Sequence, residues 1–137
     1  MMKKWLLVGF LGMFLAACAG DNTIPDRPPE ELYQEGMRLF DKTDYDEAAR
    51  YFDEIERQHP YSEWAARSQI MAAYAFYRKN QYDDAILALD RFIQLHPGNK
   101  NTPYAYYLKG LCYYEQMSDI AREQQMAVDA KDTFQEL

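Results

Sequence analysis

Cysteine and histidine are both scarce in this chain, which holds two of each in 137 residues. Cys18 ends an apolar N-terminal segment and Cys112 lies in "GLCYY", so a framework of several disulfides is excluded. We expect Cys112 to be a small buried apolar residue. His59 and His96 occupy equivalent places, each directly before a proline. That equivalence favours a structural role in two turns over a shared metal site.

Motifs of enzyme chemistry are missing as well. The sequence contains no HExxH, no glycine-rich phosphate loop, no nucleophile elbow and no CxxC. Its adjacent carboxylates, such as Asp83 and Asp84, fall in the first turns of predicted helices, where negative charge interacts favourably with the helix dipole. We therefore predict a protein that is not an enzyme and that has no metal and no cofactor.

Positive charge is in short supply. Fifteen Lys and Arg residues stand against 22 Asp and Glu residues, which gives a formal net charge of −7. Nucleic-acid binding requires clusters of Lys and Arg that meet the phosphates, so we expect no nucleic-acid partner. An acidic chain also does not bind anionic lipid headgroups through its charge, so any membrane attachment needs another cause.

The first 17 residues are typical of a secretory signal peptide. Two lysines are followed by "WLLVGFLGMFL", an apolar run too short for a stable membrane-spanning helix. The segment ends in Leu15, Ala16, Ala17 and Cys18, which resemble the lipobox of bacterial lipoproteins. An ordinary signal peptide, or an uncleaved anchor with an incidental cysteine, is the alternative.

The lipobox resemblance implies that residues 1–17 are removed and that Cys18 carries a covalent diacylglycerol and an N-acyl lipid, with palmitate as the typical acyl group. Ala19 stands where an aspartate would resemble an inner-membrane retention signal. The outer membrane is therefore the expected location, with the protein facing the periplasm. Residues 18–29, which include "GDNTIPDRPP", predict a flexible tether between the lipid and the folded part.

An internal repeat of 37 residues dominates the remaining sequence. The matched pairs are Gly36 with Ala73, Leu39 with Phe76, Tyr45 with Tyr82, Ala48 with Ala85, Phe52 with Leu89, Ile55 with Phe92, His59 with His96 and Pro60 with Pro97, and Gly110 begins a third copy. Ala48, Phe52 and Ile55 follow one another at spacings of four and three, which predicts the buried side of a helix. Each copy contains two such helical patterns, so the sequence predicts an all-α fold.

Local signals place the ends of several helices. Asp44 with Glu47 predicts a capping box, and Thr102 with Pro103 predicts an N-cap followed by a first-turn proline. Pro60 and Pro97 are expected to stop their helices, because proline has no N–H to donate.

The repeats resemble the tetratricopeptide repeat in the order of a small residue, a large apolar residue, an alanine, an aromatic residue and a final proline. This resemblance implies a superhelix of helix-turn-helix units, a solenoid. We place the domain at residues 30–137, with repeats at about 30–62, 67–99 and 104–137 and three extra residues in the connection "HPYSEWAARS". The small residue and the alanine are 12 residues apart in copy one, from Gly36 to Ala48. They are 20 residues apart in copy three, from Gly110 to Ala130. We expect these eight extra residues to lengthen the first helix or to form a loop, and the last repeat to be incomplete.

In tetratricopeptide arrays the first helix of each repeat lines a concave groove. The equivalent positions here are Glu30, Tyr33, Met37 and Phe40 in copy one, Arg67, Ile70, Tyr74 and Tyr77 in copy two, and Tyr104, Tyr107, Leu111 and Tyr114 in copy three. Tyrosine has a large ring with a polar end, which suits peptide recognition. Arg67 and Arg78 are candidates to hold a carboxylate. The alternative is that these aromatic residues belong to the core.

The lipobox, "PDRPPEELYQEG" and "LDRFIQLHPGNKNTPYAYYLKGLCYY" together resemble the BamD family, the lipoproteins of the outer-membrane β-barrel assembly machinery. The resemblance implies a non-catalytic, lipid-anchored scaffold that works with BamA and other Bam complex subunits. It also implies binding of unfolded outer-membrane proteins during their assembly and insertion. Two alternatives stay open: a generic periplasmic tetratricopeptide-repeat lipoprotein that serves envelope or peptidoglycan machinery, and the front part of an enzyme.

Overall fold

The computed structural model describes residues 23–117 and 120–137, and for residues 120–123 it describes the backbone alone. The predicted signal peptide at residues 1–17, the predicted lipidation site Cys18 and the start of the predicted tether, up to residue 22, lie outside the described residues.

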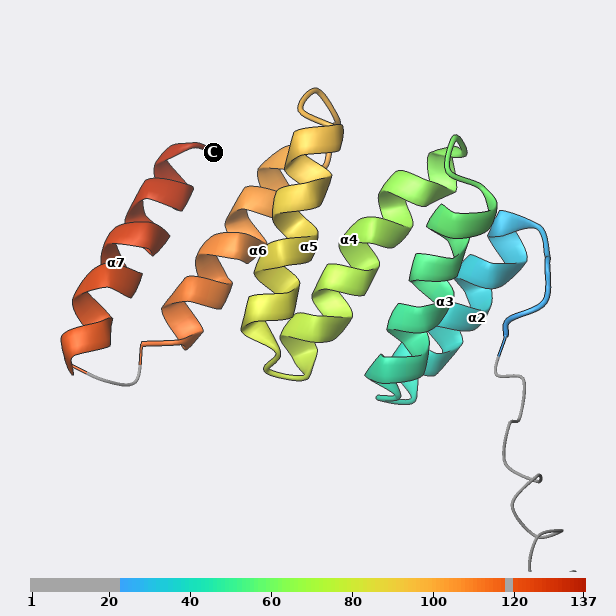
Figure 1. Ribbon diagram of the computed structural model, residues 1–137, viewed down its shortest axis with the longest axis horizontal. Coiled ribbons are helices and arrows are strands. Elements are labelled where there is room, and N and C mark those ends of the chain that lie inside the picture. The colour runs from blue at the N-terminus through green and yellow to red at the C-terminus, as the bar shows by residue number, and fades with distance from the viewer. Residues whose placement is uncertain (1–22, 118–119) are drawn as a thin grey trace, which may run out of the picture.

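Helices follow one another in pairs along the described chain (Figure 1). Their bounds are α2 Pro29–Asp41, α3 Tyr45–Gln58, α4 Glu63–Arg78, α5 Tyr82–Leu95, α6 Thr102–Glu115 and α7 Ile120–Gln135. Each helix packs against the next, and α2 also contacts α4, as α4 contacts α6. The predicted all-α fold, a tetratricopeptide-like stack of helical hairpins, is confirmed.

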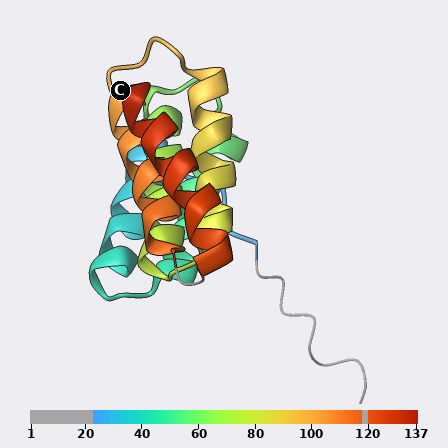
Figure 2. The same cartoon turned by 90° about the vertical axis from the view of Figure 1, so that its left-hand side faces the viewer.

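The first and second helices of the hairpins form two layers. Figure 2 looks along the stack and shows α6 (orange) and α5 (yellow) on opposite sides. Since α2, α4 and α6 contact one another in turn, the first helices form one continuous surface. No helix in the described part of the chain combines the length and apolarity that a bilayer span requires.

Close helix packing explains the small residues of the repeat. Gly36 lies against the Phe52 ring, and a Cβ placed on Gly36 would come within 2.7 Å of Phe52 Cε1. Gly110 has the same relation to Phe134, at 2.5 Å. In the second repeat, Ala73 occupies the equivalent place and shares a core cluster with Leu89. Where the second repeat has the larger Ala73 in place of glycine, it has the smaller Leu89 in place of phenylalanine.

The turns inside the first two hairpins have the same backbone conformation. Thr43 and Asn80, 37 residues apart, have φ values of 63° and 61°. After each of them, an amide N–H donates to a carbonyl five residues earlier, from Asp44 to Leu39 and from Gln81 to Phe76. This is the Schellman arrangement, which closes a helix with a left-handed residue.

Some of the predicted helix ends are confirmed. α3 and α5 end two residues before Pro60 and Pro97. Asp44 accepts a hydrogen bond from the Glu47 backbone N–H at 3.4 Å, although the Glu47 carboxylate pairs with Arg50 instead of completing the capping box.

Two predictions of helix ends are wrong. Thr102 is the first helical residue rather than the N-cap, because its hydroxyl donates to the carbonyl of His96 at 2.7 Å. The second repeat begins at Glu63 rather than near residue 67. The Ser62 side chain accepts from the Ala65 N–H at 3.2 Å, so the expected connection is largely helical.

The extra residues of repeat three lie mainly in its second helix. α6 ends five residues after Gly110, just as α2 ends five residues after Gly36. Ala48 is the fourth residue of α3, whereas Ala130 is the eleventh residue of α7. The prediction that the first helix lengthens or that a loop forms is therefore wrong, since most of the insertion extends the start of α7.

The scarce histidines and the second cysteine have structural roles, as predicted. His59 and His96 follow α3 and α5 with nearly identical backbone angles, and each donates its N–H to the preceding helical turn. Cys112 is fully buried in the core beside Leu108 and Ala105.

Candidate functional site

The first helices carry most of the predicted groove residues on one side of the stack. Steps of three, four and three residues keep a stripe on one side of a helix. We use the name aromatic face for ten residues: Tyr33, Met37 and Phe40 on α2, Arg67, Tyr74, Tyr77 and Arg78 on α4, and Tyr104, Tyr107 and Tyr114 on α6.

Stacked rings join α2 to α4 at the centre of the aromatic face. The ring centroids of Phe40 and Tyr74 are 5.3 Å apart with an interplanar angle of 23°. Tyr74 and Tyr77 lie 6.1 Å apart at 14°. Phe40 is only 9% exposed and belongs to the core, whereas Tyr74 and Tyr77 are half-buried. The centre is therefore packed ring on ring and is not a deep groove.

Arg78 covers this group of rings. Its Cζ atom lies 5.2 Å from the centroid of Tyr45, 5.8 Å from Phe40 and 5.9 Å from Tyr74, within the range of cation–π attraction. The neighbouring tyrosine hydroxyls, that of Tyr74 first, raise the pKa of the guanidinium. Arg78 is consequently a permanent, exposed cation that lies close to several aromatic rings.

A second cation–aromatic group lies near the start of α4. Tyr33 is 5.0 Å from Trp64 and 5.5 Å from Phe52, and Arg67 Cζ lies 5.3 Å above the Trp64 ring. Burial raises the pKa of Tyr33, while the charge of Arg67 opposes the shift. The Tyr33 hydroxyl therefore stays protonated at neutral pH and can donate a hydrogen bond.

The tyrosines of α6 are the most open part of the face. Tyr104, Tyr107 and Tyr114 are 43%, 45% and 60% exposed. Desolvation raises the pKa of Tyr104, and the hydroxyls of Tyr74, Tyr107 and Tyr77 raise it further. Tyr104 thus interacts electrostatically with the tyrosines of α4, and the Tyr107 ring lies 6.3 Å from the Tyr104 ring.

The structure separates the predicted residues into groups. Phe40 and Ile70 are buried core residues, and Met37 and Leu111 are half-buried against the core. Tyr114, in the last turn of α6, is exposed beyond the row of rings. Tyr33, Arg67, Tyr74, Tyr77, Arg78, Tyr104 and Tyr107 remain as the surface of the face.

Sequence reasoning missed three residues of the face. Tyr45 and Tyr82 begin the second helices, yet their rings lie 5.0 Å from Phe40 and 5.8 Å from Tyr77. Trp64 was assigned to a connection. The 37-residue offset between Tyr45 and Tyr82 was the available signal, because residues at equivalent helix starts face the same neighbours.

Charge pairing sets Arg67 and Arg78 apart from several other arginines. Arg38, Arg57 and Arg91 form ion pairs with Glu35, Glu54 and Glu56. Within the described residues, neither Arg67 nor Arg78 lies within ion-pair distance of a carboxylate. Both guanidinium groups are thus available to an acidic ligand.

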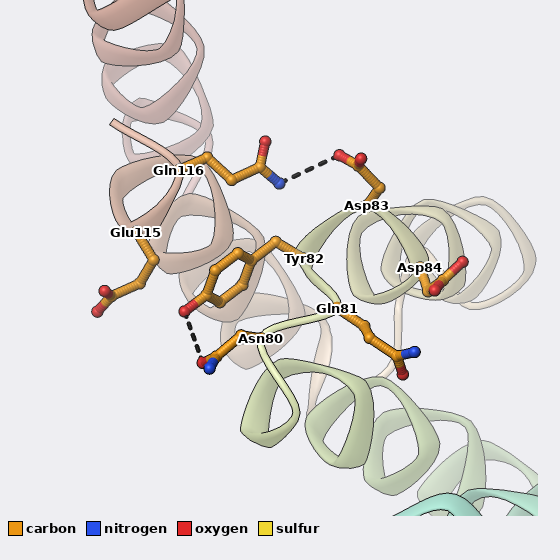
Figure 3. Close-up of a pocket in the computed structure, with 7 residues that line it drawn as sticks. All are labelled: Asn80, Gln81, Tyr82, Asp83, Asp84, Glu115 and Gln116. Carbon is orange, nitrogen blue, oxygen red and sulfur yellow. Dashed lines mark hydrogen bonds between the residues drawn. The ribbon is translucent and has the colours of Figure 1, made fainter. Parts of the chain in front are cut away.

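A hollow of about 370 Å³ lies elsewhere, between the α4–α5 turn and the end of α6 (Figure 3). Gln116 donates to Asp83 at 3.1 Å, and Tyr82 donates to Asn80 at 2.9 Å. The carboxyl groups of Asp83, Asp84 and Glu115 point in different directions, so they do not converge on a cation. The hydrogen bond from Gln116 to Asp83 instead joins the second repeat to the third.

The described residues favour binding over covalent chemistry. Burial raises the pKa of the Cys112 thiol to about 12, so it is not a nucleophile at neutral pH. No group of three or more His, Cys, Asp or Glu side chains in the described part of the chain is arranged to hold a metal ion. The aromatic face offers rings, hydroxyl donors and two guanidinium groups, which together suit an extended peptide.

Comparison with known proteins agrees with this architecture. Residues 25–137 match the YfiO family model, described as an outer membrane lipoprotein. A relative from Caulobacter vibrioides, named outer membrane protein assembly factor BamD, is 50% identical over 115 residues, which cover 80% of this chain and 38% of the relative. Proteins of the same name from Rickettsia prowazekii and Neisseria meningitidis serogroup B are 38% and 37% identical, over 93% and 84% of this chain and 51% and 46% of theirs.

The chain therefore spans between about two fifths and one half of the length of these curated relatives. The family match covers all three helical hairpins. On these matches, the chain belongs to the YfiO family of outer membrane lipoproteins, the family of the BamD assembly factors.

Proposed function

We propose that this chain is a non-catalytic lipoprotein scaffold of the β-barrel assembly machinery. It binds unfolded segments of outer-membrane proteins and partner subunits, and so assists insertion of β-barrels into the outer membrane. Family membership supports this role, because the relatives are named assembly factors. The observation that carries the binding function is the set of aromatic rings on α2, α4 and α6, in which Phe40, Tyr74 and Tyr77 stack on one another and Tyr104 and Tyr107 are exposed.

The lipid anchor is the second part of the proposal. Residues 1–17 are the signal peptide, and Cys18 carries the diacylglycerol and N-acyl lipid that hold the protein on the periplasmic side of the outer membrane. A Cys18→Ser variant is expected to lose acylation and to leave the membrane fraction. Membrane partitioning that is unchanged in this variant contradicts the lipoprotein assignment. Cys112→Ser is the matched control, because Cys112 is buried in the core.

The dimensions of the face suit an extended chain. Neighbouring packed helices lie about 8–10 Å apart, so three first helices span roughly 16–20 Å. An extended peptide rises about 3.3 Å per residue, and about five or six residues therefore cross the face. Its aromatic side chains would stack on Tyr74, Tyr104 and Tyr107, and the tyrosine hydroxyls would bond its backbone.

Arg67 and Arg78 supply the electrostatic part of this recognition. Both lie on α4 against half-buried rings, and neither has a carboxylate partner among the described residues. A carboxylate of the bound segment, at its C-terminus or on an acidic side chain, would form a charge-assisted pair with one of them.

Binding of a peptide from the C-terminus of an outer-membrane β-barrel protein tests the proposal. The Tyr74→Ala, Tyr107→Ala double variant is expected to weaken binding at least tenfold, with helicity unchanged by circular dichroism. Tyr61→Ala is the control, because Tyr61 is a fully exposed tyrosine in the α3–α4 turn. An unchanged dissociation constant in the double variant removes the aromatic face as the binding site.

Partners are tested separately, with the intact protein in detergent-solubilised membranes. Recovery of BamA and other Bam complex subunits in a pull-down supports the assembly role. Recovery of cell-wall enzymes without BamA points instead to a general periplasmic scaffold for envelope or peptidoglycan machinery.

A further inference from the structure

A furrow runs between α3 and α5, the second helices of the first two hairpins. Three hollows of about 610, 410 and 370 Å³ adjoin one another there, and Asp53 lines all three. We use the name acidic furrow for the open part of this surface. Its residues are Asp53, Glu56 and Arg57 on α3, Phe76 on α4, and Asp84, Leu87, Ala88 and Arg91 on α5.

The acidic furrow and the aromatic face lie on different sides of the stack. Phe76 lines the furrow, whereas Tyr74 belongs to the face, and residues two apart in a helix point in nearly opposite directions. The furrow is consequently separate from the surface to which we assign substrate binding.

The furrow combines an apolar patch with negative charge. Leu87 is 72% exposed and lies beside Phe76 and Ala88. An exposed leucine of this kind is significant here because it adjoins other apolar side chains in a hollow. The patch offers contact area to an apolar side chain of a partner.

Two of the acidic side chains beside this patch, Asp53 and Asp84, have no ion-pair partner among the described residues. Arg91 is paired with Glu56 at 2.7 Å across the two helices. In contrast, no ion pair or hydrogen bond of the Asp53 or Asp84 carboxylate occurs within the described residues. Figure 3 shows the Asp84 carboxyl directed away from Asp83 and Gln116. Burial raises the pKa of Asp53, an effect that the charge of Arg91 reduces and that of Glu56 increases. A basic side chain therefore complements this site.

The chain's own N-terminal segment lies next to one end of this surface. Thr23 and Ile24 line the largest of the three hollows, at the end next to the N-terminal segment. The Arg27 N–H donates to Gln58 Oε1 at 3.1 Å, and Gln58 Nε2 donates to the Pro25 carbonyl at 3.4 Å. His59 Nε2 lies 2.6 Å from the Arg27 carbonyl oxygen. Gln58 at the end of α3 and His59 directly after it thus bind a non-helical backbone, and Figure 1 shows this segment (blue) beside α2 and α3.

These contacts also change the description of the predicted tether. Residues 18–29 are expected to be flexible, yet Pro25 and Arg27 have fixed hydrogen bonds to the end of α3. The other two hollows share Asp53 with the hollow that Thr23 and Ile24 line, and one of them reaches Leu87.

We propose that the acidic furrow is a second binding site, which takes an extended segment of a partner protein. The segment carries an apolar residue that packs on Leu87 and Phe76, and a Lys or Arg that pairs with Asp53 or Asp84. Side chains two residues apart on an extended chain point to the same side, so the apolar and basic residues stand at positions i and i+2. The site is independent of the aromatic face.

A random octapeptide library selected on the full chain tests this inference. Selection on the wild type is expected to enrich peptides with Leu, Ile, Val or Phe two positions from Lys or Arg. Each enriched peptide is then synthesised with a fluorescent label, and its dissociation constant is measured by anisotropy. The furrow variant is Asp53→Asn, Asp84→Asn, Leu87→Ser, and it is expected to weaken binding at least tenfold.

Two controls assign the binding to one surface. Val128→Ser with Asp132→Asn makes similar changes on the exposed side of α7 and should leave binding unchanged. Tyr74→Ala with Tyr107→Ala should also leave these peptides bound, since the tyrosines belong to the other face. The inference is overturned if no such peptides are enriched, if the furrow variant binds them as the wild type does, or if the tyrosine variant loses them. Peptides that depend on the tyrosines alone would support the proposed function and not the furrow.

Discussion

We expect the effect of Gly36→Ala on stability to depend on the residue at position 52. The change should destabilise the protein when Phe52 is present and stabilise it when Phe52 is replaced by leucine. An added Cβ would lie 2.7, 3.0 and 3.0 Å from three ring carbons of Phe52, where carbon atoms in contact are about 3.5–4.0 Å apart. Phe52 is fully buried and cannot move away freely. Such overpacking costs about 1–3 kcal/mol, whereas alanine gains about 0.8–1.0 kcal/mol of helix propensity over glycine. The net expectation is a loss of about 1 kcal/mol.

The second repeat supplies the compensating residue. Ala73 and Leu89 are both fully buried in one cluster, at the same spacing as Gly36 and Phe52. Phe52→Leu alone should cost about 1–2 kcal/mol because a large buried ring is lost. In that background Gly36→Ala should become stabilising by up to about 1 kcal/mol, since the overlap is gone and the propensity gain remains. The coupling energy of the two changes is then about 1–3 kcal/mol.

Urea unfolding, followed by far-ultraviolet circular dichroism, measures all four members of this double-mutant cycle. The m-value should stay constant, so that a shift of the midpoint reports stability. Gly98→Ala is the control, because no atom lies within 4 Å of a Cβ placed there. If Gly36→Ala changes stability equally with Phe52 and with Leu at that position, the steric explanation of the small-residue positions is refuted.

Three more predictions concern single positions. Thr43→Asn should stabilise the protein by about 0.5–1 kcal/mol in urea unfolding, because asparagine tolerates the left-handed φ of 63° better than a β-branched residue, and Asn80→Thr should have the opposite effect. Ser68→Ala should be neutral or stabilising despite full burial, since the Ser68 hydroxyl has no hydrogen-bond partner among the described residues, and destabilisation above about 1 kcal/mol would indicate a partner or a bound water. Folding raises the pKa of Cys112 to about 12 from an ordinary value of 9.0. Above pH 9 the unfolded chain therefore loses the thiol proton first, and stability falls by up to about 1.4 kcal/mol per pH unit relative to Cys112→Ala, a slope that unfolding at pH 8–10.5 would detect.

The repeat was predictable from sequence because packing imposes one geometry on every copy. Gly36 and Gly110 have no side chain where an aromatic ring crosses, and the same demand recurs at each hairpin. The position of the insertion was not predictable in this way. The pattern of apolar residues does not distinguish a longer α7 from a longer loop, because the extra residues have no counterpart in the other two repeats.

The division between core and surface on the first helices was also beyond the sequence pattern. Phe40 and Tyr77 occupy equivalent places in their stripes, yet Phe40 is 9% exposed and Tyr77 is half-buried. The periodic pattern predicts on which side of a helix a residue lies, but it does not predict how far neighbouring helices bury that residue. Depth depends on residues of other elements, such as Tyr45, whose ring contacts Phe40 from the start of α3.

Charge pairing carries information that periodicity lacks. The chain has 22 acidic residues and 15 basic ones, so an arginine that has no carboxylate nearby is informative. Arg67 and Arg78 are 11 residues apart on α4, which returns a side chain to nearly the same side after three turns, about 16.5 Å along the axis. Both guanidinium groups lie against rings, so their side chains are already ordered and lose little entropy when an anion binds. Arg67 and Arg78 therefore offer a carboxylate two places along α4, one near each end of the helix, and the position of the bound segment follows from which of them its carboxylate meets. The acidic furrow has the opposite charge preference, which allows one small scaffold to hold two different segments on two sides at the same time.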